Sequence, residues 1–307
     1  MAETICLDKK FSTTRLVTED KPSLKHDSED KFESVLFFPE NSERKGEGGL
    51  RTKGYFKRSF ENKPLISIIT VVFNGEKYLE ETIQSVINQN YDNVEYIIID
   101  GGSADGTIEI IKKYEDQVDY WVSEKDEGIS DAFNKGIQNV YGYILMLNAG
   151  DILVDKGILN RVSNELTQPI VAYEVKNSAG RKVGLAHYRE DTLYNLSRVP
   201  HQGTFVHKLV YEDIGGYSKS LKLRMDYEFF VRAMMKYKPK LVYEVVTIYD
   251  ISGISSSLNH KYRFEVEGVI IEYLYLGESI WRVCYVPMYR LFKSAFGKIL
   301  RRLRLRA

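Results

Sequence analysis

The sequence has few cysteines, no long hydrophobic run and no net charge. Its two cysteines, Cys6 and Cys284, lie near opposite ends of the 307 residues and belong to no Cys-x-x-Cys pair or Cys/His cluster. This spacing argues against a zinc site, and two isolated thiols are typical of a reducing compartment. The 43 Lys and Arg residues balance the 43 Asp and Glu residues, so no overall charge attracts nucleic acid.

No apolar segment is long enough to cross a bilayer. A spanning helix needs about 20 largely apolar residues, and the longest candidates are residues 65–73 and 266–276. The N-terminal residues also lack the apolar stretch of a signal peptide. We therefore expect a protein that is not exported by the classical route and that is either soluble or attached to the surface of a membrane.

The first 63 residues are mostly polar and carry charges of both signs. Residues 41–53 have the composition of a loop or linker, whereas residues 35–39 form a short apolar run that suits docking on a folded domain. The sequence thus predicts three parts. These are a partly ordered N-terminal extension at 1–63, an α/β domain at 64–255 and a helical segment at 256–307.

From residue 64 onward, apolar strands alternate with amphipathic helices. The predicted strands are apolar throughout and lie at 65–73, 94–100, 119–124 and 143–151. The helices between them lie at 76–89, 107–114 and 130–140. This alternation is typical of an α/β fold with a Rossmann-like, mostly parallel sheet that helices cover on both faces. After residue 151 the pattern predicts a hairpin at 169–186, strands at 201–208 and 239–251, and a helix at 225–237.

Polar side chains follow the predicted strands where each strand ends. Phe73 and Asn74 follow the first strand, Asp100 follows the second, and Asp151 ends the stretch Asn-Ala-Gly-Asp after the fourth. Ligands of open α/β sheets bind beyond the carboxyl ends of the strands. We therefore expect Asp100 and Asp151 to face the same cleft.

Such a cleft suits a nucleotide sugar, whose diphosphate gains negative charge as it leaves. A hard cation such as Mg²⁺ or Mn²⁺ held by Asp151 would neutralise that charge. An attacking acceptor hydroxyl must lose a proton, and Asp226 is a candidate base, with Glu228 as a substitute. Each of these carboxylates has a structural alternative, because Asp100, Asp151 and Asp226 also suit turns and helix caps.

Residues 64–255 resemble family 2 glycosyltransferases of the GT-A fold, and they are most similar to bacterial enzymes that build O-antigen, capsule or exopolysaccharide. The segments that carry the resemblance are ISIITVVFNGEKYLEETIQSVINQNYDNVEYIIIDGGSADGT, SEKDEGISDAFNKGI and LNAGD, followed by HQGTFVHK and GGYSKSLKLRMDYEFFVRA. The motif order matches the family over this whole range, which makes the resemblance more specific than any single motif.

The resemblance implies an inverting transfer from a nucleotide-diphosphate sugar to an acceptor hydroxyl. Asp226 would be the base and Asp151 the metal ligand. The acceptor, a glycan or lipid-linked glycan, would lie near His201, Gln202 and Glu228. The nucleotide sugar would contact residues of the first turns and nearby elements, namely Val71, Phe73, Asn74, Asp100, Gly102, Ser103, Asn134 and Asn148.

Three motifs depart from the commoner family pattern. The nucleotide motif often reads Asp-Asp-Gly-Ser, but Gly101 stands here in place of the second acid. The metal motif keeps only Asp151, and Met225 precedes Asp226 where Glu is common. These departures put the selectivity for the nucleotide base and the strictness of the metal requirement in doubt, and we interpret them as features of a subtype.

The C-terminal residues 288–307 combine an apolar helical face with many basic residues. The face consists of Leu291, Phe292, Ala295, Phe296, Ile299, Leu300 and Leu303, and the charge comes from Arg290, Lys293, Lys298, Arg301, Arg302, Arg304 and Arg306. An amphipathic, polybasic helix is typical of an anchor on an anionic membrane surface. It predicts peripheral association with the cytoplasmic membrane, and packing on the domain or on a second subunit is the alternative.

Other functional classes fit the sequence less well. A dinucleotide-dependent oxidoreductase needs Gly-x-Gly-x-x-Gly after the first strand, where Phe-Asn-Gly-Glu-Lys-Tyr stands instead. A nucleotidyltransferase would need a triphosphate loop rich in Gly, Arg and Lys at the same place. A non-catalytic sugar-nucleotide-binding or scaffold protein of the same fold remains the alternative to the glycosyltransferase.

Overall fold

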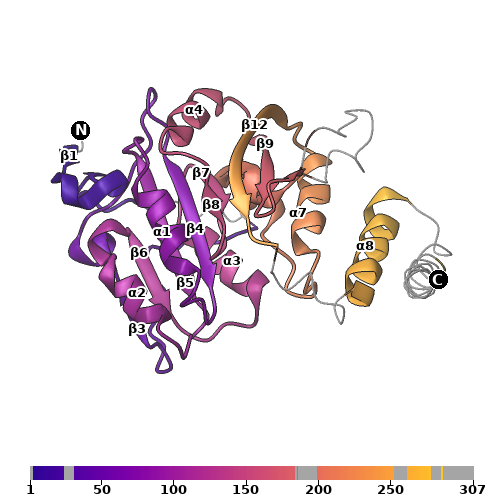
Figure 1. The fold of residues 1–307 in the computed structure, drawn as a ribbon, viewed down its shortest axis with the longest axis horizontal. Helices are drawn as coiled ribbons and strands as arrows, with labels where there is room; N and C mark the ends of the chain where they lie inside the picture. Colours follow the sequence, from indigo (N-terminus) through magenta and orange to yellow (C-terminus); the bar gives the residue numbers. More distant parts are fainter. Residues whose placement is uncertain are drawn as a thin grey trace, which may run out of the picture.

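The computed structural model of the chain describes residues 3–23, 31–183, 185, 199–251, 261–277 and 285. Within this part of the chain, one sheet contains ten strands in the order β3-β6-β5-β4-β7-β11-β9-β12-β8, with β10 paired to β9 (Figure 1). A separate two-stranded sheet joins β1 (Ile5–Cys6) to β2 (Leu16–Val17). This confirms the predicted α/β class.

One half of the large sheet is parallel, as the uniformly apolar strands predicted. Its strands are β4 (Ile66–Val72), β5 (Val94–Asp100), β6 (Tyr120–Ser123) and β7 (Tyr143–Met146). β4 pairs with β5 and β7, and β5 pairs with β6, all in parallel. Every residue of β4 and β5 is buried, because helices cover both faces of a parallel sheet.

The other half mixes strand directions. It contains β8 (Ile152–Leu153), β9 (Ile170–Asn177), β10 (Lys182–Val183), β11 (Thr204–His207) and β12 (Lys240–Tyr249). β11 runs antiparallel to β7 and β9, and β12 runs parallel to β9. The β9–β10 hairpin is confirmed. The strand predicted at 201–208 is shorter, because His201–Gly203 form a 3-10 turn before it.

Two groups of helices cover the two faces of the sheet. One group consists of α1 (Leu79–Ile87), α2 (Thr107–Lys113) and α4 (Ile158–Glu165), and the other of α3 (Ile129–Gln138), α6 (Lys208–Ile214) and α7 (Met225–Met234). Successive residues of β5 point to opposite groups, since Ile97 and Ile99 pack with Phe133 of α3, whereas Ile98 packs with Ile83 of α1. Alternation along each strand therefore builds two cores from one sheet.

The prediction of a loop or linker at 41–53 is wrong for the central residues. Residues Gly46–Gly48 form β3, which pairs antiparallel with β6 at the edge of the sheet. Just after it, Arg51 is almost fully buried and lies 2.8 Å from the carboxylate of Glu95 on β5. This part of the N-terminal extension is thus tied into the same sheet as the α/β core, through backbone pairing and a buried ion pair.

Helix α8 (Lys261–Leu276) follows the sheet and packs against α7 through Ile271, Tyr227 and Val231 (Figure 1). In the part of the chain that the structure describes, no helix has the length and apolar character needed to cross a membrane. The predicted basic helix at 288–307 lies outside the described residues.

Candidate active site

The turns that follow β4 and β5 are bonded to each other. Asn74 adopts a left-handed conformation, with φ of 51°. Its backbone N–H donates to Oγ of Ser103 over 2.7 Å, and its side-chain oxygen accepts from the N–H of Ala104 over 2.9 Å. The next N–H, of Gly75, donates to the hydroxyl of Thr107 over 2.9 Å. These bonds place the two turns at one edge of the sheet, where the sequence predicted the nucleotide site.

Asp100 holds this edge together from inside. Its carboxylate has no exposed surface and accepts hydrogen bonds from the N–H of Ser103 over 3.0 Å, from the Ser103 hydroxyl, and from the Ser123 hydroxyl over 2.5 Å. The expectation that the Asp100 carboxylate faces an open cleft is therefore wrong, because its bonds turn it into the protein. Whether Asp100 also contacts a nucleotide stays a prediction.

Beyond the end of β7, two buried side-chain oxygens accept no hydrogen bond from the described residues. They are Oδ1 of Asn148 and Oδ2 of Asp151. The other carboxylate oxygen of Asp151 accepts from the N–H of Asp250 over 3.1 Å. Burial raises the pKa of Asp151 to about 6, although the nearby charge of His201 works in the opposite direction. Buried polar atoms are normally satisfied, so these two oxygens are candidate contacts for a ligand or a cation.

His201 connects this place to Asp226. Its Nε2 lies 3.2 Å from Nδ2 of Asn148, and its Nδ1 lies 3.2 Å from Oδ2 of Asp226. One nitrogen of the imidazole thus faces Asn148 and the other faces Asp226, each within hydrogen-bond distance. The ring also packs edge-on against Phe133, with centroids 6.1 Å apart. The 3-10 turn before β11 thus fixes the position of the imidazole between Asn148 and Asp226.

Asp226 lies in the first turn of α7, and its side chain is 33% exposed. Its Oδ1 accepts from the N–H of Tyr227 over 2.8 Å. Burial of the group works against the charged form, but the hydrogen bond and charge of His201 outweigh it, so the pKa of Asp226 lies below its usual value. An ionised carboxylate that is anchored yet accessible is suited to accept a proton.

Two residues that were predicted to contact substrate bind other parts of the protein instead. Glu228 is buried and binds Arg232 through both carboxylate oxygens, over 2.6 and 3.0 Å, and it accepts from the hydroxyl of Tyr275 over 2.9 Å. Asn134 bonds the backbone N–H and C=O of Tyr217, each over 2.8 Å. Both side chains hold neighbouring elements together, so their predicted contacts with substrate gain no support from the geometry.

The remaining predicted residues lie in the turns or strands around this edge. Val71 is buried within β4, Gly102 has the left-handed φ of 85°, and the backbone carbonyl of Gln202 accepts from the hydroxyl of Thr247 over 2.7 Å. Phe73 is 66% exposed, which is unusual for so large an apolar side chain at the end of a buried strand.

Sequence reasoning missed two carboxylates near the site. Asp250 follows β12 and donates its N–H to Asp151, as described above. Asp126 follows β6 and lies over Gly101. Asp126 belongs to the quoted stretch Ser-Glu-Lys-Asp-Glu-Gly, but a polar residue in a polar loop gives no signal of its own.

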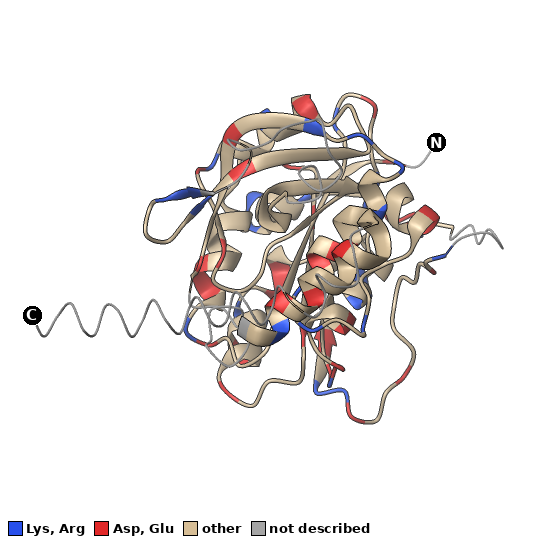
Figure 2. Cartoon of the chain, turned by 90° about the vertical axis from the view of Figure 1, so that its right-hand side faces the viewer, with Lys and Arg blue, Asp and Glu red and all other residues tan. Residues whose placement is uncertain are grey.

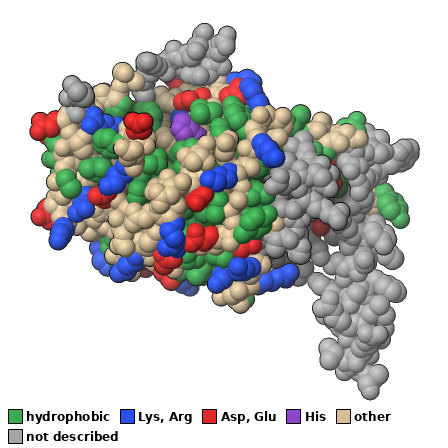
Figure 3. All heavy atoms as spheres, turned by 90° about the horizontal axis from the view of Figure 1, so that it is seen from above, with side chains coloured by type: hydrophobic (Ala, Val, Ile, Leu, Met, Phe, Trp, Pro, Cys, Tyr) green, Lys and Arg blue, Asp and Glu red, His purple; other side chains and the backbone are tan. Residues whose placement is uncertain are grey.

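Charges of both signs are mixed over the molecular surface. Lys, Arg, Asp and Glu are interspersed on the chain in Figure 2 and on the face shown in Figure 3. Among the described residues, no three His, Cys, Asp or Glu side chains gather in a group that is able to hold a metal ion.

Comparison with known proteins identifies the family. The profile of the family described as glycosyl transferase family 2 matches residues 67–225, about half of the chain. The chain belongs to glycosyl transferase family 2. The matched range contains both turns, the Asn148–Asp151 loop and His201, and the protein is therefore a glycosyltransferase. This confirms the predicted family and enzyme class and sets aside the oxidoreductase and nucleotidyltransferase alternatives.

Several bacterial relatives of this glycosyltransferase are at least 30% identical to it, among them the following two. An uncharacterised glycosyltransferase of Mycobacterium tuberculosis is 31% identical over 203 residues, which is 63% of this chain and 78% of that protein. One from Haemophilus influenzae is 30% identical over 197 residues, which is 59% of this chain and 76% of that protein.

Solved structures share the fold of this glycosyltransferase. Residues 1–349 of S. aureus TarS in complex with UDP-GlcNAc give a TM-score of 0.57 at 19% identity, over 67% of this chain. The mannosyltransferase PcManGT from Pyrobaculum calidifontis, in complex with GDP-Man and Mn²⁺, gives 0.56 at 18% identity, over 71% of this chain. This chain covers 65% of the length of each. These likenesses confirm the GT-A fold.

Proposed function

We propose that this glycosyltransferase moves a sugar from a nucleotide-diphosphate sugar to a hydroxyl of a glycan or lipid-linked glycan, with inversion at the anomeric carbon. The observation that carries the proposal is the row of contacts from Asn148 through His201 to Asp226, whose carboxylate is accessible and ionised. The buried carboxylate of Asp151, one oxygen of which has no hydrogen-bond partner among the described residues, follows Asn148 in the same loop. On this proposal, stabilisation of the leaving group would fall to Asn148 and Asp151, and removal of the proton would fall to Asp226.

The donor nucleotide is proposed to lie over the turns after β4 and β5. The exposed ring of Phe73 offers a stacking surface for a base, and the bonded turns at Asn74 and Ser103 are pre-organised. S. aureus TarS and PcManGT, which share the fold, were solved with UDP-GlcNAc and GDP-Man respectively, which supports a nucleotide-sugar donor here.

A divalent cation fits the residues present. Oδ2 of Asp151 and Oδ1 of Asn148 are hard oxygen atoms without a hydrogen-bond partner in the described chain, and such atoms are the ligands that Mg²⁺ and Mn²⁺ prefer. When bound, the cation would stabilise negative charge on the leaving diphosphate. With two protein oxygens available, the remaining ligands would come from the donor itself and from water.

Asp226 is the proposed base. It would take the proton of the acceptor hydroxyl as the hydroxyl oxygen forms a bond to the anomeric carbon and the bond from that carbon to the diphosphate oxygen breaks. His201 would keep the carboxylate ionised and oriented. Its own contact with the acceptor, and that of Gln202, stay predictions.

The wider setting is also a proposal. A lipid-linked acceptor on the cytoplasmic side of a bacterial membrane, within O-antigen or capsule synthesis, would require docking of the basic C-terminal residues 288–307. The division of the chain at residues 64 and 256 likewise stays a prediction.

A donor screen tests the proposal. Purified full-length protein would be mixed with UDP-, GDP-, dTDP- and CDP-sugars and lipid extract, with Mg²⁺, Mn²⁺ or chelator, and the release of nucleoside diphosphate would be measured. We expect turnover of one donor class that chelator and Asp151→Asn both abolish. Absence of binding and turnover with every donor, in a folded protein, would contradict the proposal and favour a non-catalytic member of the family.

A further inference from the structure

The side chain of Asp126 occupies the space above Gly101. A Cβ atom added to Gly101 would lie 2.6 Å from Oδ2 of Asp126 and 3.4 Å from Cδ2 of Phe73. A separation of 2.6 Å is too short for a real contact, so the carboxylate already fills the volume that a side chain at position 101 would take. Asp126 therefore reaches the turn after β5 from the next loop along the sheet.

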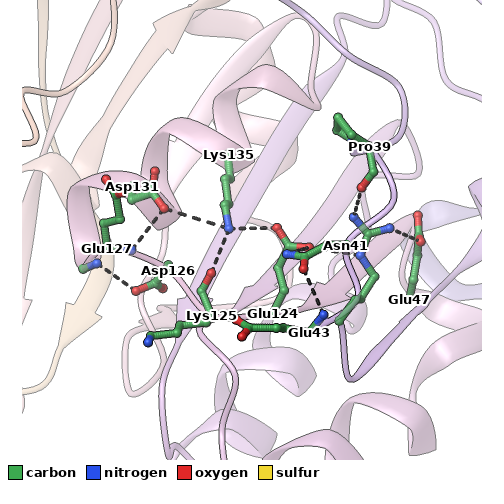
Figure 4. A network of polar contacts seen from close by, with 12 residues as sticks. Pro39, Asn41, Glu43, Glu47, Glu124, Lys125, Asp126, Glu127, Asp131 and Lys135 are labelled. Atoms are coloured by element: carbon green, nitrogen blue, oxygen red, sulfur yellow. Dashed lines mark hydrogen bonds and ion pairs between the residues drawn. The ribbon is translucent and has the colours of Figure 1, made fainter.

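The loop that carries Asp126 is held at both of its ends. Lys135 of α3 lies 2.8 Å from the carboxylate of Glu124 and donates to the carbonyl of Lys125 over 3.3 Å. The N–H of Glu127 donates to Asp131 over 3.2 Å. Figure 4 shows these contacts on either side of Asp126. The position of the carboxylate is thus fixed by the protein before any ligand arrives.

Only one oxygen of Asp126 is used within this loop. Its Oδ1 accepts from the N–H of Gly128 over 2.8 Å, whereas Oδ2 points at Gly101 and accepts no hydrogen bond from the described residues. The carboxylate is partly exposed. A pre-positioned acceptor with a free oxygen, next to the exposed ring of Phe73, is suited to a flat ligand with N–H or O–H donors at its edge.

We propose that Asp126 contacts the nucleoside of the sugar donor, in the place that Gly101 leaves open. This inference rests on the proposed function and adds a specificity-determining residue to it. Asp126 would accept a hydrogen bond from the nucleoside. The donor would be either the ring N–H of a base that stacks on Phe73 or a ribose hydroxyl. Selectivity for the base would then depend on the loop after β6 rather than on the turn after β5.

The first experiment measures the affinity of the full-length protein for UDP, GDP, dTDP and CDP by titration calorimetry. We expect Asp126→Asn to bind the preferred nucleoside diphosphate about tenfold to one hundredfold more weakly, because a hydrogen bond to a charged acceptor is lost. Glu127→Gln is the matched control. Its side chain is 75% exposed and, among the described residues, pairs with Lys219 over 3.4 Å. The affinity of this variant should therefore equal that of the wild type.

A charge swap tests the shared space directly. Gly101 is not in the left-handed region, so its backbone accepts a side chain once Asp126 is removed. Gly101→Asp and Asp126→Gly should each weaken binding, and the double variant should recover at least half of the lost affinity in logarithmic terms. Analogues of the preferred nucleoside diphosphate distinguish the two possible hydrogen-bond donors, the ring N–H and the ribose hydroxyl. One analogue carries a methyl group on the ring nitrogen of the base, and the other carries deoxyribose. The analogue that lacks the hydrogen-bond donor contacted by Asp126 should bind the wild type more weakly than the parent ligand, but should bind Asp126→Asn as well as the parent ligand does.

The outcomes separate this inference from the proposed function. If the wild type binds a nucleoside diphosphate and Asp126→Asn binds it equally well, the role of Asp126 is overturned while the proposed function stands. A folded double variant that binds no more tightly than the single variants would also contradict the claim that the side chains at positions 101 and 126 occupy the same space. If the folded wild type binds none of the four nucleotides, both proposals fail together.

Discussion

Nδ1 of His201 lies 3.2 Å from Oδ2 of Asp226, and this contact lowers the pKa of the carboxyl against the effect of burial. The opposite ring nitrogen lies 3.2 Å from Nδ2 of Asn148, so the imidazole is held between the two side chains. The imidazole is therefore a positioning residue for the proposed base, and its effect is to keep that base ionised at lower pH.

Replacing His201 by Ala is expected to move the acid limb of the pH–rate profile upward. The contact that lowers the pKa of Asp226 is lost while the burial that raises it remains, so the pKa rises. A base must be ionised to act, and activity would then disappear at a higher pH than in the wild type. The measurement is kcat against pH, from nucleoside diphosphate release.

His207→Asn is the control for that profile. His207 pairs with Tyr143 at the amino end of β7, away from the candidate site. Its ring caps α6 by accepting from the N–H of Leu209. Asn preserves an acceptor there, and the acid limb should not move. A lower kcat in His201→Ala with an unmoved acid limb would indicate that His201 contacts the acceptor instead of tuning Asp226.

Phe73→Ala is expected to weaken binding of the nucleotide without destabilising the fold. The ring is 66% exposed, so its removal exposes little of the core. Stacking of a base on an aromatic ring contributes about 1–3 kcal/mol in single-stranded nucleic acid complexes, which predicts a loss of roughly 5- to 150-fold in affinity by calorimetry. Tyr243→Ala, on β12 and 62% exposed, should leave both affinity and stability unchanged. A loss of stability in Phe73→Ala alone would show a structural role.

The parallel half of the sheet was predictable from the sequence because burial on both faces demands uninterrupted apolar strands, as in β4 and β5. The edge strand β3 was not predictable. Its residues, Gly46, Glu47 and Gly48, have no apolar pattern. Its pairing with β6 depends on backbone hydrogen bonds and on the lack of side chains at Gly46 and Gly48, where a Cβ would meet the ring of Trp121. Short edge strands carry little information in their side chains.

The site was only partly predictable for a related reason. The resemblance singled out Asn148, Asp151, His201 and Asp226 one at a time, since each belongs to a motif. His201 contacts both Asn148 and Asp226 because β11 lies beside β7 and α7 packs on the sheet. No local sequence pattern encodes this packing. Asp126 was missed because its position becomes informative only beside Gly101, where its carboxylate fills the volume that a side chain would take.

Arg51→Met is expected to destabilise the fold strongly, although residue 51 lies in the N-terminal extension. Its guanidinium donates to Glu95 and to the carbonyls of Leu36 and Asn139, all over 2.8–2.9 Å. Removing one partner of a buried ion pair costs about 3–5 kcal/mol, because the other charge stays buried and unpaired. Urea unfolding followed by circular dichroism gives the free energy.

Lys53→Met is the matched control for Arg51. Lys53 pairs with Asp116 over 2.7 Å, but the two side chains are 43% and 55% exposed. Exposed pairs contribute about 0–1 kcal/mol, so the unfolding midpoint should barely change. An effect of Arg51→Met as small as that of Lys53→Met would show that the buried ion pair of Arg51 contributes little to the stability of the sheet.

Truncation after residue 286 is expected to abolish binding to anionic vesicles while nucleotide binding persists. Each basic residue close to an anionic surface contributes about 1 kcal/mol, and the removed segment contains seven Lys and Arg. Co-sedimentation with vesicles of phosphatidylglycerol and phosphatidylcholine measures the effect, and added salt should weaken binding of the full chain. Replacing Lys298, Arg301, Arg302 and Arg304 by Gln keeps the apolar face and should remove most of the binding. If the full chain fails to sediment with these vesicles, the segment packs on protein instead of on a membrane.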